Sequence, residues 1–107
     1  MKNIGKTINK YITLFLLPAV WYANLEITAY YQGHVTCNGT QPIPWYTCAA
    51  DDLPRGTKVT VNGHTWVVDD CFGAHHKNKL DLFMPDYNSC IQWGRRTINC
   101  RIETPNW

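Results

Sequence analysis

The stretch Val67–Met84, VVDDCFGAHHKNKLDLFM, contains the features that decide the fold. It opens with a β-branched run that ends in two carboxylates, Asp69 and Asp70. A turn-rich loop follows, and then an apolar segment that contains a third carboxylate, Asp81. A carboxylate at the end of an apolar segment is costly to bury unless it is paired or hydrogen-bonded. These aspartates therefore either satisfy backbone groups at turns or form a functional site.

A basic and then apolar segment precedes the rest of the chain. Three lysines come first, followed by the uncharged run Tyr11–Ala23. This run is shorter than the about 20 residues of a membrane-spanning helix, and its length and flanks suit a signal-peptide core. Trp21 stands where a cleavage site has a small residue, so a retained anchor stays open, and Pro18 disfavours a buried helix. We predict a signal peptide or anchor over residues 1–24 and a folded domain over 25–107.

The composition limits the folded part to one small domain. A domain of about eighty residues buries a modest core and often needs covalent staples. The formal net charge of +2 is too small, and the basic residues are too scattered, to indicate a nucleic-acid partner. We expect a monomer, and the predicted signal peptide or anchor favours a location in the cell envelope, the periplasm or the medium.

Five cysteines follow the hydrophobic segment, which indicates an oxidising compartment and disulfides. Because Cys37 and Cys48 flank one irregular loop, we expect a bridge between them. A second bridge should join Cys71 to Cys90 or to Cys100, which leaves one thiol unpaired. No C-x-x-C spacing occurs, so we expect no metal site and no cofactor.

Apolar alternation, turn residues and capping residues together predict a mostly-β fold. Asn62-Gly63 is a strong hairpin signal, because both residues tolerate positive φ. Pro85-Asp86 begins a short helix, and Gly94 ends it. Five or six short strands with one helix favour a small barrel over a parallel α/β fold. The strands are expected over residues 27–31, 58–61, 64–70, 80–84 and 96–102.

A long irregular stretch, Gln32–Thr47, separates the first two of these predicted strands and carries Trp45 and Tyr46. Loops of this length in small domains are usually functional or pinned. The two aromatic rings either stack on sugar faces or pack onto the barrel. In the predicted strand over residues 64–70, Trp66 shares a face with Asp70, because side chains alternate along a strand.

Four pieces of the sequence, taken together in chain order, resemble the three-aspartate (3D) domain. They are the opening strand ITAYY (27–31), the segment AADDLPRGTKVTV (49–61), the spacing from Asp70 to Asp81 with LDLF (80–83), and WGRR (93–96). The 3D domain is a double-psi β-barrel, a fold shared with the rare lipoprotein A family, the membrane-bound lytic transglycosylase A family and the expansins. The resemblance implies a six-stranded barrel of this kind.

The resemblance also implies a peptidoglycan or related polysaccharide substrate and, in the enzymatic branches, a lytic transglycosylase reaction. Asp70 falls on the family's catalytic aspartate, Asp81 on its third aspartate, and Asp51 is the best candidate for the first. A single aspartate serves this reaction by giving a proton to the leaving oxygen and then taking one from a sugar hydroxyl. Neighbouring carboxylates and burial raise the pKa of such a group.

We expect Trp45, Tyr46, Trp66 and Arg95 to contact the polymer, whereas the adjacent His75 and His76 are more simply solvated loop residues. Two other functions stay open. One is a non-catalytic, expansin-like polysaccharide-binding module. The other is a disulfide-stapled secreted interaction protein that uses the barrel as a scaffold.

Overall fold

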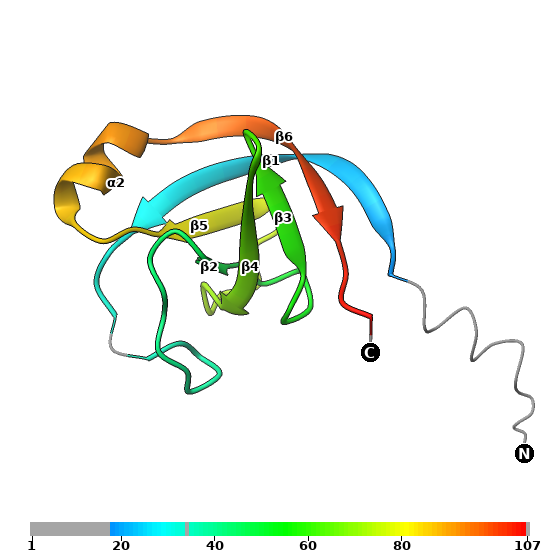
Figure 1. Ribbon diagram of the computed structural model, residues 1–107, viewed down its shortest axis with the longest axis horizontal. Coiled ribbons are helices and arrows are strands. Elements are labelled where there is room, and N and C mark those ends of the chain that lie inside the picture. The colour runs from blue at the N-terminus through cyan, green and yellow to red at the C-terminus, as the bar shows by residue number, and fades with distance from the viewer. Residues whose placement is uncertain (1–17, 34, 107) are drawn as a thin grey trace, which may run out of the picture.

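A closed barrel of six strands forms the body of the protein. The computed structural model describes residues 18–33 and 35–106. The strands follow the order β1-β5-β2-β4-β3-β6 around the barrel, and the helix α2 lies beside it (Figure 1). This confirms the predicted mostly-β barrel with a short helix. The elements are β1 Val20–Tyr30, β2 Thr47–Ala49, β3 Lys58–Val61, β4 His64–Asp70, β5 Lys79–Phe83, α2 Tyr87–Trp93 and β6 Arg96–Glu103.

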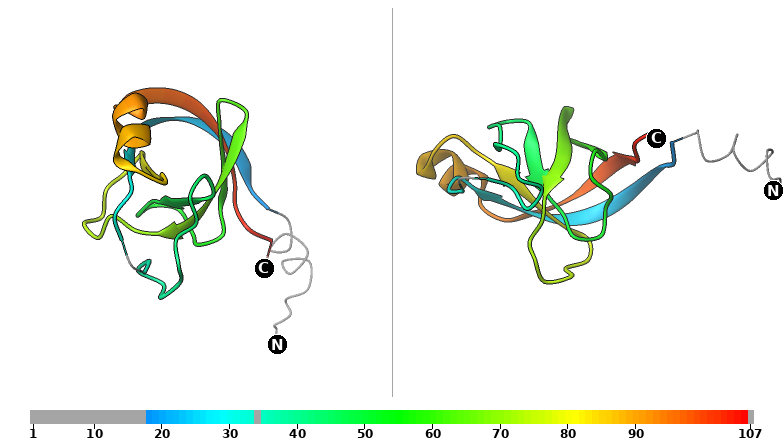
Figure 2. Two further views of the ribbon diagram at one scale, coloured as in Figure 1. Left: turned by 60° about the vertical axis from the view of Figure 1, so that its left-hand side comes forward. Right: turned by 90° about the horizontal axis from the view of Figure 1, so that it is seen from below.

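Two of the strand pairs are parallel, β1 with β5 and β2 with β4, and the other four are antiparallel. Closure leaves no unpaired sheet edge. The further views show α2 and the C-terminus at opposite ends of the molecule (Figure 2). Within the described part of the chain, no helix is both long and apolar enough to cross a bilayer.

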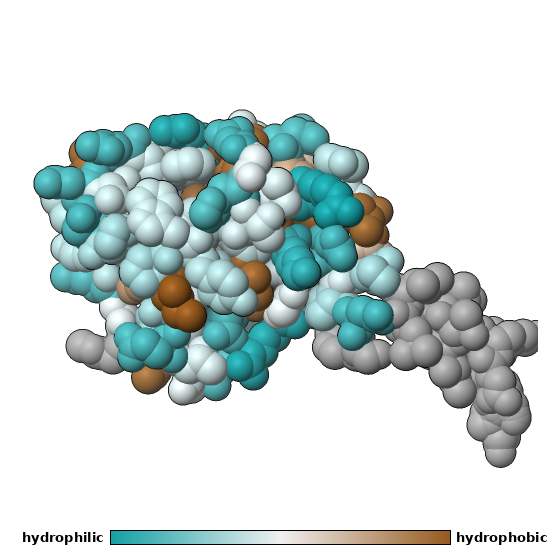
Figure 3. Space-filling model, viewed as in Figure 1, coloured by the Kyte–Doolittle hydropathy of each residue, from teal (hydrophilic) through white to brown (hydrophobic). Residues whose placement is uncertain are grey.

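The core follows the alternation that the sequence predicts. Asn62 and Gly63, with φ of 49° and 82°, form the turn of the β3–β4 hairpin, which confirms that prediction. Polar residues cover most of the face seen in Figure 3, as a period of two along half-buried strands requires. The fully buried side chains include Ile27, Leu80, Leu82, Met84, Ile102, Val59 and Val68.

The predicted helix is confirmed, and so are both of its end signals. Asp86 is the N-cap, and its side chain accepts a hydrogen bond from the Ser89 backbone N–H at 2.8 Å. At the other end, the Gly94 N–H donates to the Cys90 carbonyl at 3.0 Å, and φ of 70° at Gly94 favours glycine. The indole N–H of Trp93 donates to the Ile27 carbonyl at 3.0 Å, which fixes α2 against β1.

Strand β1 is longer than the strand predicted over residues 27–31. Its first residues, Val20–Asn24, pair with the second half of β6 in antiparallel register. The barrel therefore begins ahead of the boundary predicted at residue 25, because aromatic and β-branched residues favour extended structure even where they are exposed. The rest of the segment predicted as signal or anchor, through residue 17, lies outside the described residues.

Strand β2 was not predicted, because its residues lie in stretches with the composition of loops. All three of its residues are buried, and it lies between β4 and β5. A strand this short shows no alternation, and the prolines and glycines around it are typical of loops.

Both predicted disulfides are wrong. The bridge joins Cys37 to Cys71, whose Cα atoms are 6.0 Å apart, and the three other cysteines are free. Cys48 and Cys100 belong to the barrel core and have no exposed surface, so neither can reach a loop cysteine. The position of Cys48 in the unpredicted strand β2 is therefore the physical reason for the error.

Candidate functional site

Strand β2 places two of the predicted aspartates on either side of one residue. Ala49 pairs with Asp70 of β4 on one side and with Asp81 of β5 on the other, and Asp81 pairs in turn with Thr28 of β1. The apolar neighbours of Asp81 on β5 point into the core, so Asp81 lies on the outer face of the barrel. The fold therefore brings Asp70 and Asp81 together.

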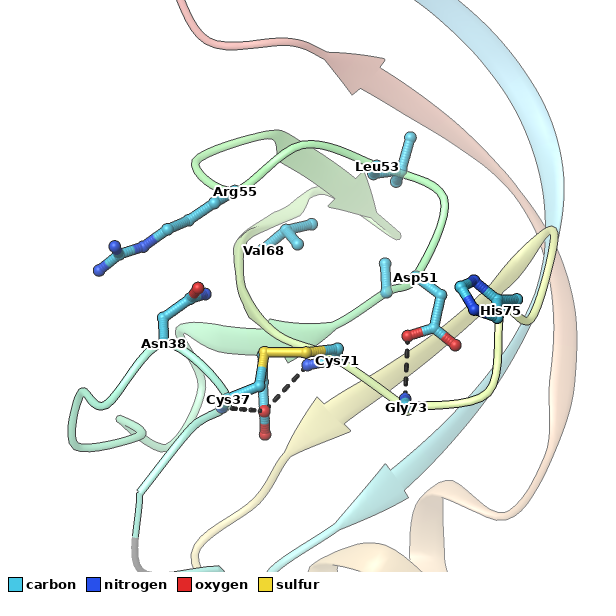
Figure 4. Close-up of a pocket in the computed structure, with 11 residues that line it drawn as sticks. Cys37, Asn38, Asp51, Leu53, Arg55, Val68, Cys71, Gly73 and His75 are labelled. Atoms are coloured by element: carbon cyan, nitrogen blue, oxygen red, sulfur yellow. Dashed lines mark hydrogen bonds between the residues drawn. A yellow bond between two sulfur atoms is a disulfide. The ribbon is translucent and has the colours of Figure 1, made fainter.

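Asp70 is held by three hydrogen-bond donors from two sides of the site. Its Oδ1 atom accepts the backbone N–H groups of Cys37 and Cys71, both at 2.9 Å (Figure 4). Its Oδ2 atom accepts the Tyr30 hydroxyl at 2.8 Å. Burial raises the pKa of Tyr30, and the hydrogen bond to Asp70 raises it further, so Tyr30 stays protonated as a donor. The two cysteines that present their N–H groups to Asp70 are those joined by the disulfide.

Asp81 has a different environment, in which the described part of the chain supplies one side-chain donor. The Thr28 hydroxyl donates to its Oδ1 atom at 2.8 Å. Burial raises the pKa of Asp81; the Thr28 hydrogen bond acts in the opposite direction, and the negative charge of Asp70 raises the pKa again. The net direction is upward, so Asp81 retains a proton more readily than an ordinary aspartate.

Asp51 anchors the loop that follows β4, residues 71–78, which we call the histidine loop. Its two oxygens accept the backbone N–H groups of Phe72, Gly73, Ala74 and His76, at 2.8 to 3.4 Å, and the His76 ring Nδ1–H at 3.1 Å. Although burial acts to raise the pKa of Asp51, these hydrogen bonds outweigh it and hold the pKa well below its usual range. The side chain is 6% exposed. Asp51 therefore acts as a fixed anion that shapes a loop.

Asp69 anchors a second loop, residues 35–46, which we call the disulfide loop because it contains Cys37. Its carboxylate accepts the Arg55 Nε–H at 2.7 Å and the Thr40 hydroxyl. The Asn38 side-chain amide donates to the Asp69 backbone carbonyl at 2.9 Å. Asp69 thus serves the turn-stabilising role that the sequence left open for the aspartate pair.

A pocket of about 360 Å³ opens between these two loops. The disulfide forms one wall, and Asp51, Asp70 and His75 line other parts of it (Figure 4). Arg55 and Asn38 lie on the side opposite His75 (Figure 4). The site therefore combines carboxylates with hydrogen-bonding side chains at its rim, which suits a hydroxyl-rich ligand.

Of the aromatic residues predicted to contact substrate, two are exposed and one is not. Trp45 and Tyr46 have 50% and 47% of their surface exposed, respectively. Trp66 is 3% exposed and belongs to the core cluster, so its predicted contact with substrate is wrong: it fills the barrel. Trp45 adopts φ of 65°, and its carbonyl accepts the His64 Nε2–H at 2.6 Å. A non-glycine residue in this conformation needs such support from its surroundings.

The predicted contact residue Arg95 lies beside a second pocket, next to residues that the sequence analysis missed. Its Nη1 atom donates to Glu26 at 2.7 Å, and Lys79 reaches the other oxygen of Glu26 at 3.3 Å. Thr28 lines the same pocket. The polar positions of β1 alternate with buried ones, but their role emerges only from the parallel register of β1 with β5.

Cys37, Asp70 and Cys71 bring ligand-type atoms within 4.8 Å of one another. The two cysteine sulfur atoms are bonded to each other in the disulfide, so neither is available as a thiolate ligand. In the oxidised protein this group therefore serves to position Asp70.

No protein-family model matches the chain. A comparison with curated proteins finds similarity to a Bacillus subtilis (strain 168) protein named "cell wall shaping protein YabE", with 35% identity over 51 residues. The match covers 47% of this chain and 12% of that protein, so the chain spans only a small part of its relative.

Proposed function

We propose that this chain is a double-psi barrel domain that acts on peptidoglycan outside the cytoplasm. The closed barrel with two parallel strand pairs supports the fold, and the relative named for cell wall shaping supports the substrate class. The disulfide fits an oxidising compartment. The residues that resemble the 3D domain fall on β1, on β2 to β5, and on the end of α2.

The observation that carries the proposed activity is the difference between two neighbouring carboxylates. Asp70 accepts three hydrogen bonds, whereas Asp81 accepts one from a side chain and has a raised pKa. Carboxylates held in environments this different divide the acid and anion roles between them. We therefore assign the proton to Asp81 and the charge-stabilising role to Asp70, whereas the sequence resemblance implies that Asp70 is the catalytic aspartate.

The reaction that fits this pair is lytic transglycosylation. Asp81 protonates the glycosidic oxygen, the bond from that oxygen to the anomeric carbon breaks, and the Asp70 carboxylate stabilises the positive charge that develops on the sugar. A hydroxyl of the same sugar then attacks the anomeric carbon and returns its proton to Asp81. The product carries an anhydro ring, and no water is consumed.

The test is mass spectrometry of the products that purified sacculi release. Wild-type protein should release anhydro-sugar fragments, and Asp81→Asn should reduce the rate by about 10²–10⁴-fold, the usual scale of general acid–base catalysis. Asp52→Asn is the matched control, because Asp52 is exposed and, among the residues that the structure describes, accepts only the Asn78 backbone N–H, at 2.9 Å. A folded Asp81→Asn protein with the wild-type rate would refute this role for Asp81.

The second candidate is a polysaccharide-binding module without catalysis, which the exposed rings of Trp45 and Tyr46 favour. Such rings stack on sugar faces without any acid. In that case wild-type protein binds sacculi but releases no anhydro fragments, and Trp45→Ala weakens binding while Asp81→Asn does not.

A further inference from the structure

A second pocket, of about 200 Å³, lies on the outer face of β1 and β5, beside the proposed acid. Glu26, Thr28 and Lys79 line it from the two strands, and Glu26 pairs with Lys79 in their parallel register. Asp81 pairs with Thr28 and lies next to the pocket, outside its lining. The rest of the lining comes from the histidine loop and from Arg95, just after α2. We call this the Glu26 pocket.

One anion in the Glu26 pocket holds two cations. Arg95 and Lys79 contact different oxygens of Glu26, at 2.7 and 3.3 Å, and their side chains are 64% and 41% exposed. The hydrogen bond from Arg95, followed by that from Lys79, lowers the pKa of Glu26, so the carboxylate stays ionised. A guanidinium has five N–H donors and an ammonium has three. Donors therefore remain for a second carboxylate, and the three charges sum to one positive charge.

The wall of the pocket adds a partly apolar surface. Phe72 and His76 lie ring against ring, with centroids 4.9 Å apart, and both line the pocket. Asp51 fixes this pair, since it accepts the backbone N–H groups of both residues. The pocket thus presents cations on one side and ring surfaces on another, an arrangement that fits a short organic chain ending in a carboxylate.

We infer that the Glu26 pocket binds the carboxylate-bearing substituent of a glycan whose scissile bond lies at Asp81, an inference that rests on the proposed function. Thr28 connects the Glu26 pocket to the proposed acid, since it lines the pocket and donates a hydrogen bond to Asp81 at 2.8 Å. Glu26 and Lys79 lie two residues along their strands from Thr28 and Asp81, a distance of about 7 Å. A substituent on the sugar ring at Asp81 spans that distance.

The carboxylate has two sources in peptidoglycan, the stem peptide and, where the peptide is removed, the lactyl group of the muramic sugar. The experiment measures binding to intact sacculi, to glycan strands stripped of peptide, and to chitin oligosaccharides, which carry no carboxylate. Wild-type protein should bind one or both of the first two polymers more tightly than chitin oligosaccharides. The more tightly bound polymer identifies the source.

Arg95→Gln should remove this preference, with about a tenfold loss for the carboxylate-bearing polymer and no loss for chitin oligosaccharides. Arg101→Gln is the matched control, because Arg101 forms a similar ion pair with Glu103, at 2.8 Å, away from the Glu26 pocket. Glu26→Gln should strengthen binding of the carboxylate-bearing polymer, since it frees both cations from their acidic partner. If the cluster of Glu26, Lys79 and Arg95 had only a structural role, Glu26→Gln would not strengthen this binding.

The outcomes separate the two proposals. If wild-type protein binds none of the three polymers, the proposed function fails and takes this inference with it. If it binds chitin oligosaccharides as tightly as the others, or if Arg95→Gln weakens binding to all three equally, this inference alone is refuted. Circular dichroism and thermal unfolding of each variant establish that it is folded.

Discussion

The two loops that border the candidate site are held by different physical means. The disulfide loop, residues 35–46, is tied to the end of β4 by the Cys37–Cys71 bridge and by polar contacts to Asp69. The histidine loop, residues 71–78, is held by Asp51, which accepts four of its backbone N–H groups. The disulfide loop therefore depends on the redox state of two sulfur atoms, and the histidine loop beyond Cys71 depends on the charge of one carboxylate.

This difference shows how a small barrel keeps a polar site in order. Most residues of both loops are exposed or half-buried, so core packing does not order them, and chain entropy opposes the order of both. The covalent tie also positions chemistry, because both cysteines donate their backbone N–H groups to Asp70. The carboxylate anchor has its hydrogen-bonding capacity taken up by the loop, because Asp51 is already surrounded by donors. Disrupting each anchor in turn tests the contrast.

The largest effect is expected from removal of the disulfide. The Cys37→Ser/Cys71→Ser variant should lose about 3–4 kcal/mol of unfolding free energy, as loop-closure entropy predicts for a bridge between residues separated by 34 positions. Urea denaturation measures it. Cys90→Ser is the control, since Cys90 is free. If the double variant matches the control, the polar contacts of Asp69 hold the loop alone.

A smaller loss is expected from Asp51→Asn, because the amide oxygen still accepts some of the donors. The loss should depend on pH. The pKa of Asp51 is lowered in the folded state, so its stabilisation is present above the unfolded value of about 4 and is lost as pH falls through the folded pKa. Thermal unfolding of wild-type and variant protein should therefore differ most near neutral pH and converge in acid. A constant difference across pH would show that the charge of Asp51 is not the anchor.

Much of the barrel was predictable from local sequence. The Asn62-Gly63 turn, the capping by Asp86 and Gly94, and the alternation of β4 and β6 all depend on residues close together in the chain. Strand β2 and the start of β1 were not predicted, because both exist only through pairing with strands far along the chain.

The candidate site shows the same difference between features that depend on local sequence and features that depend on distant strand pairing. The spacing of Asp70 and Asp81 was visible in the sequence, but the reason they meet is Ala49, on the unpredicted strand between them. Glu26 and Thr28 carried no sequence signal of their own, because their place beside Asp81 depends on the parallel register of β1 with β5. The disulfide was mispredicted for a related reason, since β2 buries Cys48 in the core.

A smaller loss of unfolding free energy is expected from Asp69→Asn. This substitution tests the polar contacts that hold the disulfide loop besides the bridge. The Arg55 side chain is 57% exposed, so its ion pair with Asp69 is screened by water and contributes little. With the Thr40 hydroxyl also affected, the loss should be about 1 kcal/mol, measured by urea denaturation. Because the bridge remains, the amide protons of Cys37 and Cys71 should keep their hydrogen-exchange protection. Loss of that protection would show that Asp69, rather than the disulfide, positions the donors to Asp70.

The smallest effect is expected from His76→Gln, which separates the ring contact with Asp51 from the backbone contacts. The His76 ring is 36% exposed and supplies only one of the five donors to Asp51, while the backbone N–H groups of the loop are unchanged by the substitution. A partly exposed contact of this kind should contribute no more than about 0.5 kcal/mol to the free energy of unfolding. Hydrogen exchange at the Phe72 and Gly73 amides is the sharper measurement, because both donate to the same oxygen of Asp51 and report its position. Their protection should be unchanged in the variant, since a carboxylate held by four backbone groups does not need the imidazole to stay in place.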